Sequence, residues 1–140
     1  MGEPRLLVTG GSGFIGSAVI RIARARGFAI RNLDFRPPNL PEQQAHWVNV
    51  DVRSQRDVER EMLAYRPDFV LHMASDIDVT LKTLDEYRTT TLGTTHVLQA
   101  AAQLPDLRRL IHVSTQFVVR PGRTPQSETC LLYTSPSPRD

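Results

Sequence analysis

The residues best suited to chemistry are a glycine-rich run near the amino terminus and an acid that follows it. Residues 9–16, TGGSGFIG, follow the apolar residues 6–8 directly. Glycines at this spacing allow a tight turn, a close approach of backbone to a pyrophosphate, and close packing of a helix on a sheet. A helix that begins here aims free N–H groups at the phosphates. Asp34 lies 18 residues after Gly16, near the roughly 20 that separate such a turn from an acid on the ribose. We therefore predict a dinucleotide site, whose phosphate-binding residues are Gly10, Gly13, Phe14, Ile15 and Gly16.

Asp34 also indicates which dinucleotide is bound. A carboxylate at this position repels a 2′-phosphate, so the sequence favours NAD over NADP. Arg36 keeps NADP open as the less favoured cofactor, because an arginine can hold that phosphate. The alternative for Arg36 is a solvated loop residue. The alternative for the whole segment is a tight strand-to-helix turn without a ligand, which leaves the acid unexplained.

Further candidates lie where later predicted strands end. Asp51 and Val52 follow the third strand, where an acid can accept a hydrogen bond from the adenine amino group; a turn aspartate is the alternative. His72 ends the fourth strand, and we expect it to bond to backbone near the phosphates and shape the turn. Ala74 and Ser75 follow it and are small enough to leave room for the cofactor.

The fifth predicted strand ends in Ser114, Thr115 and Gln116. This end lies on the crevice side of an open α/β sheet, where ligands bind. A hydroxyl there can donate to a substrate oxygen as its charge develops. The alternative is a hydroxyl that satisfies backbone at the end of a strand.

Strands and helices alternate along the chain. We expect strands over residues 6–8, 28–33, 46–50, 69–74 and 109–114, and helices over residues 12–27, 54–65 and 84–104. Ser12 is expected to cap the first helix, whose buried face would carry Ile15, Val19, Ile22 and Ala23. Residues 36–41 contain three prolines and are expected to form a loop. The alternation and the right-handed crossover rule predict an α/β fold with a doubly wound parallel sheet, strand order 3-2-1-4-5, truncated after strand 5.

Composition excludes several classes of protein. A chain of 140 residues with 40% apolar and 23% charged residues fits one globular domain. A net charge of +2 is too small to indicate binding to nucleic acid or to a membrane surface. No run approaches the ~20 apolar residues of a membrane span, and residues 1–5 lack an apolar signal region. We therefore expect a cytoplasmic protein, and we assign no metal ligands.

The motifs together resemble those of the extended short-chain dehydrogenase/reductase family, which includes NAD-dependent nucleotide-sugar epimerases and dehydratases. The resemblance rests on residues 9–16, Asp34, Asp51-Val52, HMAS at 72–75, LGTTHVLQAA at 92–101 and VST at 113–115. It implies a Rossmann-type fold, NAD as cofactor, and a homodimeric parent protein that acts on a nucleotide sugar or another small hydroxyl compound. It also implies that Met73, Ala74, Ser75 and Thr90 lie at the cofactor, and that Thr115 is the catalytic hydroxyl.

The chain departs from the family pattern at several positions. Thr90 stands where the family usually has an asparagine that steadies the active site, and residues 118–120 read VVR where VYG is frequent. Gln116 and Phe117 stand where family dehydratases carry an acid pair, which argues against a sugar 4,6-dehydratase. None of the three tyrosines is followed by lysine four residues later, so we expect the family's Tyr-x-x-x-Lys proton-transfer pair to lie beyond residue 129.

The chain is therefore expected to divide into two parts. Residues 1–129 would be an incomplete NAD-binding domain without its substrate domain, inactive by itself. Residues 130–140, CLLYTSPSPRD, look like a translated sequencing-library adapter, and we expect them to be a non-native tail. This tail holds the only cysteine, so no redox role is assigned.

Several functions stay open at this point. The first is an NAD-dependent epimerase, dehydratase or reductase in which Thr115 polarises the substrate and the tyrosine transfers the proton. The second is an atypical member that senses the dinucleotide or binds a partner without chemistry, which Thr90 favours. A third is an enzyme like 3-beta-hydroxysteroid dehydrogenase, because residues 76–81, DIDVTL, resemble that branch of the family.

Overall fold

The computed structural model describes residues 2–78 and 80–115. Strand and helix alternate along them, as predicted. The strands are β1 (Arg5–Thr9), β2 (Ala29–Asp34), β3 (Trp47–Asn49), β4 (Phe69–His72) and β5 (Arg109–His112). The α-helices are α1 (Phe14–Ala25), α2 (Gln55–Tyr65) and α3 (Arg88–Ala101), and two 3-10 helices are η1 (Pro41–His46) and η2 (Leu84–Glu86).

The five strands form one parallel sheet in the order β3-β2-β1-β4-β5, which confirms the predicted topology. The central strand, β1, pairs with β2 on one side and with β4 on the other. Because all strands run the same way, their carboxyl ends meet at one edge, where Thr9, Asp34 and His72 lie. The direction of winding reverses between β1 and β4, and a crevice forms at such a point in doubly wound sheets.

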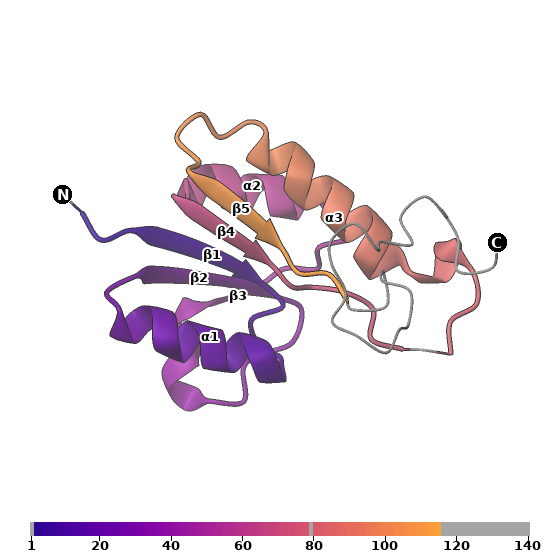
Figure 1. Cartoon of the computed structure of the whole chain (residues 1–140), viewed down its shortest axis with the longest axis horizontal. Coiled ribbons are helices and arrows are strands. Elements are labelled where there is room, and N and C mark those ends of the chain that lie inside the picture. The colour runs from indigo at the N-terminus through magenta and orange to yellow at the C-terminus, as the bar shows by residue number, and fades with distance from the viewer. Residues whose placement is uncertain (1, 79, 116–140) are drawn as a thin grey trace, which may run out of the picture.

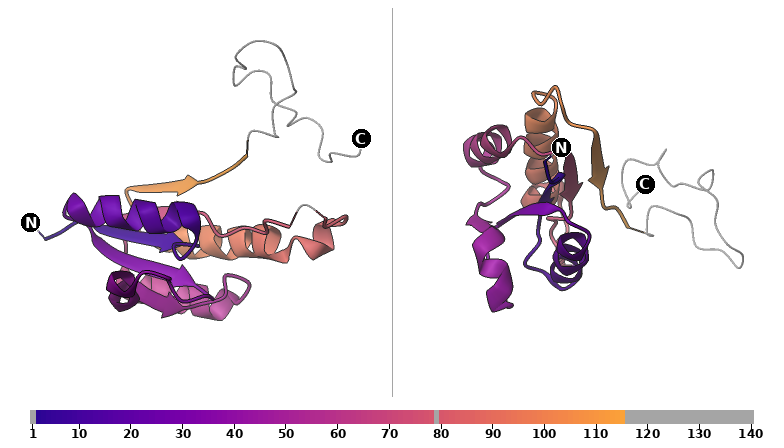
Figure 2. Two further views of the ribbon diagram at one scale, coloured as in Figure 1. Left: turned by 90° about the horizontal axis from the view of Figure 1, so that it is seen from below. Right: turned by 90° about the vertical axis from the view of Figure 1, so that its left-hand side faces the viewer.

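Helices cover both faces of this sheet. α1 lies on one face, and α2 and α3 pack together on the other (Figures 1 and 2). Neighbouring residues of β1 pack on opposite faces of the sheet. Leu7 belongs to the core beneath α2 and α3, and Val8 belongs to the core that contains Ile20 of α1. Both β1 side chains are fully buried, as expected for a central parallel strand covered on both faces.

The buried face of α1 differs from the predicted one. The residues that it buries are Gly16, Ile20 and Ala23, whereas Ile15 and Ile22 are 66% and 47% exposed. The buried residues lie at i, i+4 and i+7, which is a regular helical row. The apolar pattern predicted Ala23 correctly but missed Gly16 and Ile20. The row begins with a glycine, whose place depends on close contact and not on hydrophobicity.

Two predicted boundaries are also wrong. Pro41 does not belong to a loop but begins η1, since the first position of a helix needs no N–H donor. The long helix predicted over residues 84–104 is divided at Tyr87 into η2 and α3. Thr83 and Glu86 form a capping box around η2, so the chain closes one short turn before α3 begins.

Candidate functional site

The glycine-rich turn joins β1 to α1 at the carboxyl edge of the sheet. Gly10 has a φ of +72°, a conformation that residues with a side chain rarely adopt. A Cβ atom on Gly10 would lie 2.9 Å from the backbone nitrogen of Ala74, and one on Gly16 would lie 2.6 Å from the carbonyl oxygen of Gly10. The turn therefore touches the segment after β4 and the start of α1 backbone to backbone, which only glycine permits.

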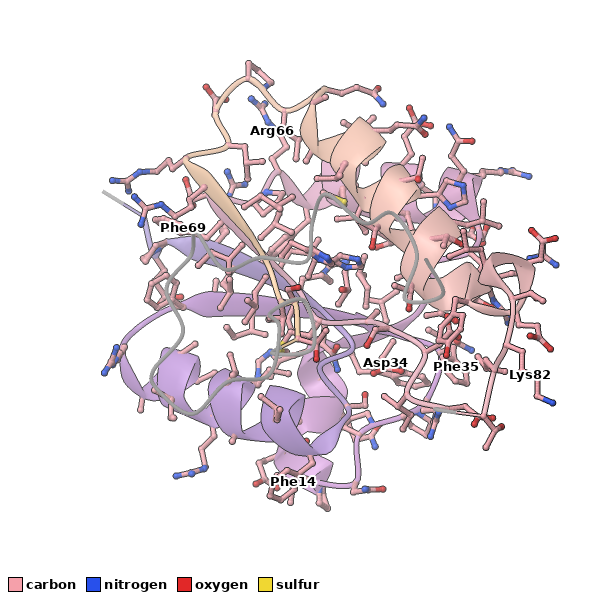
Figure 3. The ribbon with its side chains drawn as sticks, turned by 45° about the vertical axis from the view of Figure 1, so that its right-hand side comes forward. Phe14, Asp34, Phe35, Arg66, Phe69 and Lys82 are labelled. Atoms are coloured by element: carbon pink, nitrogen blue, oxygen red, sulfur yellow. The ribbon has the colours of Figure 1, made fainter. Side chains whose placement is uncertain are left out.

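Gly13 differs from these two glycines. Its backbone is extended, with φ −75° and ψ 176°, and any residue can adopt this conformation. A Cβ atom here would meet only the carbonyl oxygen of Gly10, at an ordinary 3.4 Å. The fold therefore does not require glycine at position 13, and this face of the turn is open. The next residue, Phe14, is 97% exposed and points away from the body of the protein (Figure 3).

The first turn of α1 lies at this open face. Gly13 is its N-cap and makes no side-chain capping bond, and the turn carries no acid. The first N–H groups of a helix have no partner within it and bear partial positive charge. This end of α1, formed by Phe14, Ile15 and Gly16, is therefore suited to receive an anion such as a phosphate.

Asp34 is fixed beside the glycine-rich turn. It is 9% exposed, and it lies at the end of the sheet opposite Arg66 and Phe69 (Figure 3). Its Oδ2 accepts a hydrogen bond from the N–H of Ser12 at 3.0 Å, and its Oδ1 accepts one from the N–H of Arg36 at 3.0 Å. A carboxylate has about four lone-pair positions, so Asp34 can still accept hydrogen bonds from two ribose hydroxyls.

Asn32, two residues before Asp34, is a site residue that the sequence prediction missed. It is fully buried; its Oδ1 accepts from the N–H of Gly11 at 3.0 Å, and its Nδ2 donates to Oγ of Ser12 at 3.1 Å. Ser12 therefore braces the turn against β2 and does not cap α1, contrary to the prediction. The available signal was an asparagine within the predicted strand, because this residue type is uncommon in strands.

His72 binds neighbouring elements through both ring nitrogens. It is 1% exposed; its Nδ1 lies 2.6 Å from Oγ1 of Thr9, and its Nε2 lies 2.9 Å from Oγ1 of Thr94. Burial, and secondarily the neighbouring His112, lower the pKa of His72 to about 4. The sequence prediction placed its partners on the backbone, whereas the structure shows two hydroxyl groups that came from distant parts of the chain.

The segment after β4 lies against the glycine-rich turn. The N–H groups of Met73 and Ala74 each lie 3.2 Å from Oγ1 of Thr9. Ser75 follows and is exposed. Contact of these residues with a cofactor stays a prediction, but the structure brings Met73 and Ala74 next to Gly10 at the carboxyl edge of the sheet.

Thr90 ties this segment to α3. Its Oγ1 accepts from the N–H of Asp76 at 2.9 Å, and its own N–H donates to Oδ2 of Asp76 at 2.9 Å. The two bonds are reciprocal, as in a capping box. Thr90 thus holds the chain after β4 at the start of α3, and a direct contact with the cofactor stays a prediction.

Asp51 and Val52 lie beyond β3 and have partners within the protein. The side chain of Arg53 donates to Oδ1 of Asp51 at 3.0 Å and to Oδ2 at 2.6 Å, and this hydrogen bonding holds the pKa of Asp51 below its usual value. An adenine amino group would share the carboxylate with Arg53. Val52 is 4% exposed, and its carbonyl oxygen accepts from Nδ1 of His96 at 2.9 Å. Val52 is therefore a core residue, and its predicted cofactor contact is untested.

The remaining predicted residues lie at the margins. The guanidinium of Arg36 stacks on the ring of Phe35, 4.8 Å from its centre, and both are exposed. Thr115 is exposed and lies three residues beyond the end of β5. Gln116, Phe117, residues 118–120 and residues 130–140 lie outside the described residues.

Within residues 2–78 and 80–115, no group of three or more His, Cys, Asp or Glu side chains is arranged to hold a metal ion. No helix in this part of the chain is long and apolar enough to cross a membrane.

A comparison with protein families decides between the readings of this fold. The model of the NAD-dependent epimerase/dehydratase family matches residues 6–139. The chain belongs to this family. Among its relatives are dTDP-glucose 4,6-dehydratase of Neisseria gonorrhoeae, 32% identical over 138 residues, covering 84% of this chain and 40% of the relative, and UDP-glucose 4-epimerase of Azospirillum brasilense, 34% identical over 104 residues, covering 70% of this chain and 30% of the relative.

Solved structures agree with this assignment to the epimerase/dehydratase family. UDP-glucose 4-epimerase of Thermus thermophilus in complex with NAD superposes with a TM-score of 0.77 at 30% identity, covering 91% of this chain and 43% of the epimerase. The UDP-glucose 4-epimerase of Brucella ovis in complex with NAD gives 0.77 at 26%, covering 90% and 40%. This chain thus spans about two fifths of the length of such relatives. The predicted extended short-chain dehydrogenase/reductase resemblance and the Rossmann-type fold are confirmed.

Proposed function

We propose that this chain is the NAD-binding part of an enzyme that transfers hydride to and from a nucleotide sugar or a similar hydroxyl or ketone substrate. The observation that carries the proposal is the position of Asp34. A buried carboxylate is hydrogen-bonded to the amide of Ser12, one residue before the open N-terminal end of α1. A helix end that can donate N–H groups to a phosphate and a carboxylate that can accept from a ribose are thereby placed side by side, as a dinucleotide requires.

The same geometry supports NAD over NADP. A 2′-phosphate would meet the Asp34 carboxylate, whose oxygens are already held by the amides of Ser12 and Arg36. The guanidinium of Arg36 stacks on Phe35 and would have to leave that ring to reach a phosphate. Two NAD complexes among the structural neighbours add support.

NAD, when bound, accepts a hydride from a carbinol carbon and can return it. In the proposed mechanism Thr115 donates a hydrogen bond to the substrate oxygen, which stabilises negative charge as it develops. A tyrosine and a lysine from sequence beyond residue 129 would move the hydroxyl proton. We also propose that residues 1–129 are an incomplete domain, that residues 130–140 are a non-native tail, and that the parent protein is a cytoplasmic homodimer.

Isothermal titration of this chain with NAD and NADP tests the cofactor proposal. We expect NAD to bind at least tenfold more tightly than NADP, and we expect Asp34→Ala to remove this preference. Equal binding of the two dinucleotides by the unmodified chain would refute the assignment of Asp34. Phe35→Leu is a matched control, because it changes an exposed neighbour of Asp34 without touching the carboxylate.

Two alternatives rest on particular observations. A dinucleotide sensor without chemistry is favoured by Thr90, whose hydroxyl is already bound by Asp76. A hydroxysteroid substrate is favoured by a relative, 3-beta-hydroxysteroid dehydrogenase of Mycolicibacterium neoaurum, 29% identical over 138 residues and covering 88% of this chain and 37% of the relative. The uninterrupted protein, assayed with UDP-glucose, dTDP-glucose and a 3β-hydroxysteroid, separates them. Turnover of a sugar nucleotide supports our proposal, turnover of the steroid alone supports the second alternative, and NAD binding without turnover of any of the three supports the sensor.

A further inference from the structure

His72 links three elements at the point where the winding of the sheet reverses. It ends β4, its Nδ1 reaches Thr9 at the end of β1, and its Nε2 reaches Thr94 on α3. Thr9 in turn accepts hydrogen bonds from the N–H groups of Met73 and Ala74. One imidazole therefore connects β1, the strand before the glycine-rich turn, to α3, which covers the sheet face opposite α1.

The hydrogen positions in this network follow from counting donors and acceptors. A hydroxyl oxygen has two acceptor positions and one proton. The N–H of Ala74 donates to Oγ1 of Thr9 at 3.2 Å. The N–H of Met73 is shared between this hydroxyl oxygen and the carbonyl oxygen of Thr9, at 3.2 Å from each. Because backbone N–H groups can only donate, Oγ1 of Thr9 serves them as an acceptor, and this leaves its hydroxyl proton to point to Nδ1 of His72, at 2.6 Å. Nδ1 is therefore an acceptor, and the ring proton lies on Nε2, where it is donated to Thr94.

We propose that His72, held as the Nε2–H tautomer by Thr9 and Thr94, is a positioning residue. It sets the spacing between the two turns that face the dinucleotide, which are the glycine-rich turn of residues 9–16 and the turn of residues 73–75 after β4. The proposal rests on the proposed NAD binding. His72 itself touches no cofactor; it acts through Thr9 on the backbone of Met73 and Ala74.

The spacing matters because the two turns meet without side chains between them. The position of a Cβ atom on Gly10 would lie 2.9 Å from the nitrogen and 3.0 Å from the Cα of Ala74. A small displacement of Ala74 therefore displaces Gly10, and with it the open phosphate-binding face of the turn. The hydroxyl of Thr9 fixes Ala74, and the imidazole fixes that hydroxyl.

Only neutral imidazole fits this network. A second ring proton on Nδ1 would face the hydroxyl proton of Thr9 and break the bond. The surroundings agree: the ring is buried, and the only titratable side chain in ring contact with it among the described residues is His112, stacked at 5.2 Å. Burial and this neighbour lower the pKa of His72 to about 4, so the neutral form is present at physiological pH.

Nitrogen NMR of the 15N-histidine-labelled chain tests the tautomer directly, because protonated and unprotonated ring nitrogens have well-separated shifts. We expect His72 to show an unprotonated Nδ1 and a protonated Nε2 at pH 7. A protonated Nδ1 would overturn the inference, whatever the affinity for NAD.

Calorimetry with NAD tests the positioning role. Thr94→Val removes the acceptor for Nε2–H with little change of shape, and we expect it to weaken NAD binding about tenfold, the effect of one lost buried hydrogen bond. Thr94→Ser restores the hydroxyl and should restore both the affinity and the amide shifts of Met73 and Ala74. Thr95→Val is the matched control, since the Thr95 hydroxyl donates to the Thr91 carbonyl on the exposed side of α3.

The outcomes separate the two levels of the argument. If the unmodified chain fails to bind NAD, the proposed function is wrong, and the NMR result still decides the tautomer. If the chain binds NAD and Thr94→Val binds it equally well with unchanged Met73 and Ala74 amide shifts, the positioning role is wrong. If Thr94→Val unfolds, Thr9→Ser and Thr9→Val repeat the comparison at the other nitrogen, with Thr9→Val alone expected to lose affinity.

Discussion

Two glycines of one turn, Gly13 and Gly16, should respond in opposite ways to the same substitution. Gly16 touches the protein's own backbone, whereas Gly13 faces open space in the direction from which a phosphate would arrive. Gly16→Ala should therefore damage the fold, and Gly13→Ala should spare the fold and damage NAD binding. The pair separates a structural glycine from a ligand-binding glycine within four residues.

The structure supplies the magnitudes. A Cβ atom on Gly16 would lie 2.6 Å from the carbonyl oxygen of Gly10 and 2.6 Å from the Cα of Gly11, and neither backbone atom can rotate away. Such overpacking costs typically 1–3 kcal/mol, and we expect about 3 kcal/mol. For a domain near this size that lowers Tm by about 6–12 °C. Gly13→Ala has no such contact and should change the free energy of unfolding by less than about 1 kcal/mol, in the stabilising direction.

The effect of Gly13→Ala on NAD comes from the ligand side. A Cβ atom at the open face would keep a pyrophosphate from one or two backbone N–H groups, each charge-assisted bond being worth about 1.5–3 kcal/mol. We expect NAD binding to weaken about ten- to a hundredfold, and Gly13→Val to weaken it further.

Urea unfolding and isothermal titration with NAD, performed on both variants, give the two readouts. Normal NAD binding by Gly13→Ala and Gly13→Val would refute the phosphate assignment, and a Gly16→Ala variant as stable as the parent would refute the packing argument. Gly27→Ala is a control for backbone strain without overpacking, because its φ is +82° and no atom lies within 4 Å of the Cβ position.

Three further predictions concern other parts of the site and fold. Asp34→Ala should weaken NAD binding about ten- to a hundredfold, because hydrogen bonds to a charged group are lost, and Asp34→Asn should fall between it and the parent chain; equal titration curves for all three would show that Asp34 does not meet the ribose. His72 has a pKa lowered to about 4 from an ordinary value near 6.5, so the unfolded chain takes up a proton at higher pH than the folded chain. The contribution of neutral His72 to the free energy of unfolding is therefore complete above pH 6.5 and is lost as the pH falls to 4. Urea unfolding should show a loss of about 2 kcal/mol between pH 7 and pH 5 from this group that His72→Gln lacks, and the same loss in both proteins would contradict the assignment. Ile111 is 53% exposed on β5, which is one of the two edge strands of the described sheet, so the chain should associate through it and Ile111→Lys should reduce the association; light scattering that finds a monodisperse monomer of the unmodified chain would contradict this.

Features of this protein that depend on local spacing could be predicted from its amino-acid sequence. The glycine-rich turn, the acid at the end of the next strand, and the alternation of strand and helix are each contained in a short stretch of chain. The order 3-2-1-4-5 follows from that alternation because the handedness of the crossovers leaves few other arrangements. The spacing of residues 9–16 and Asp34 is likewise local, and it is sufficient to predict a dinucleotide site.

The task of each residue within that site depends instead on contacts between distant parts of the chain. Asn32 holds the glycine-rich turn by hydrogen bonds, and Gly16 rather than Ile15 is buried on α1. His72 bonds to Thr9 and Thr94, which lie 63 and 22 positions away in the chain. Spacing cannot reveal such partners, because a buried polar group bonds to whatever donor or acceptor the packing brings within reach. The chain specifies these pairs through the sheet as a whole, by bringing the carboxyl ends of β1, β2 and β4 to one edge.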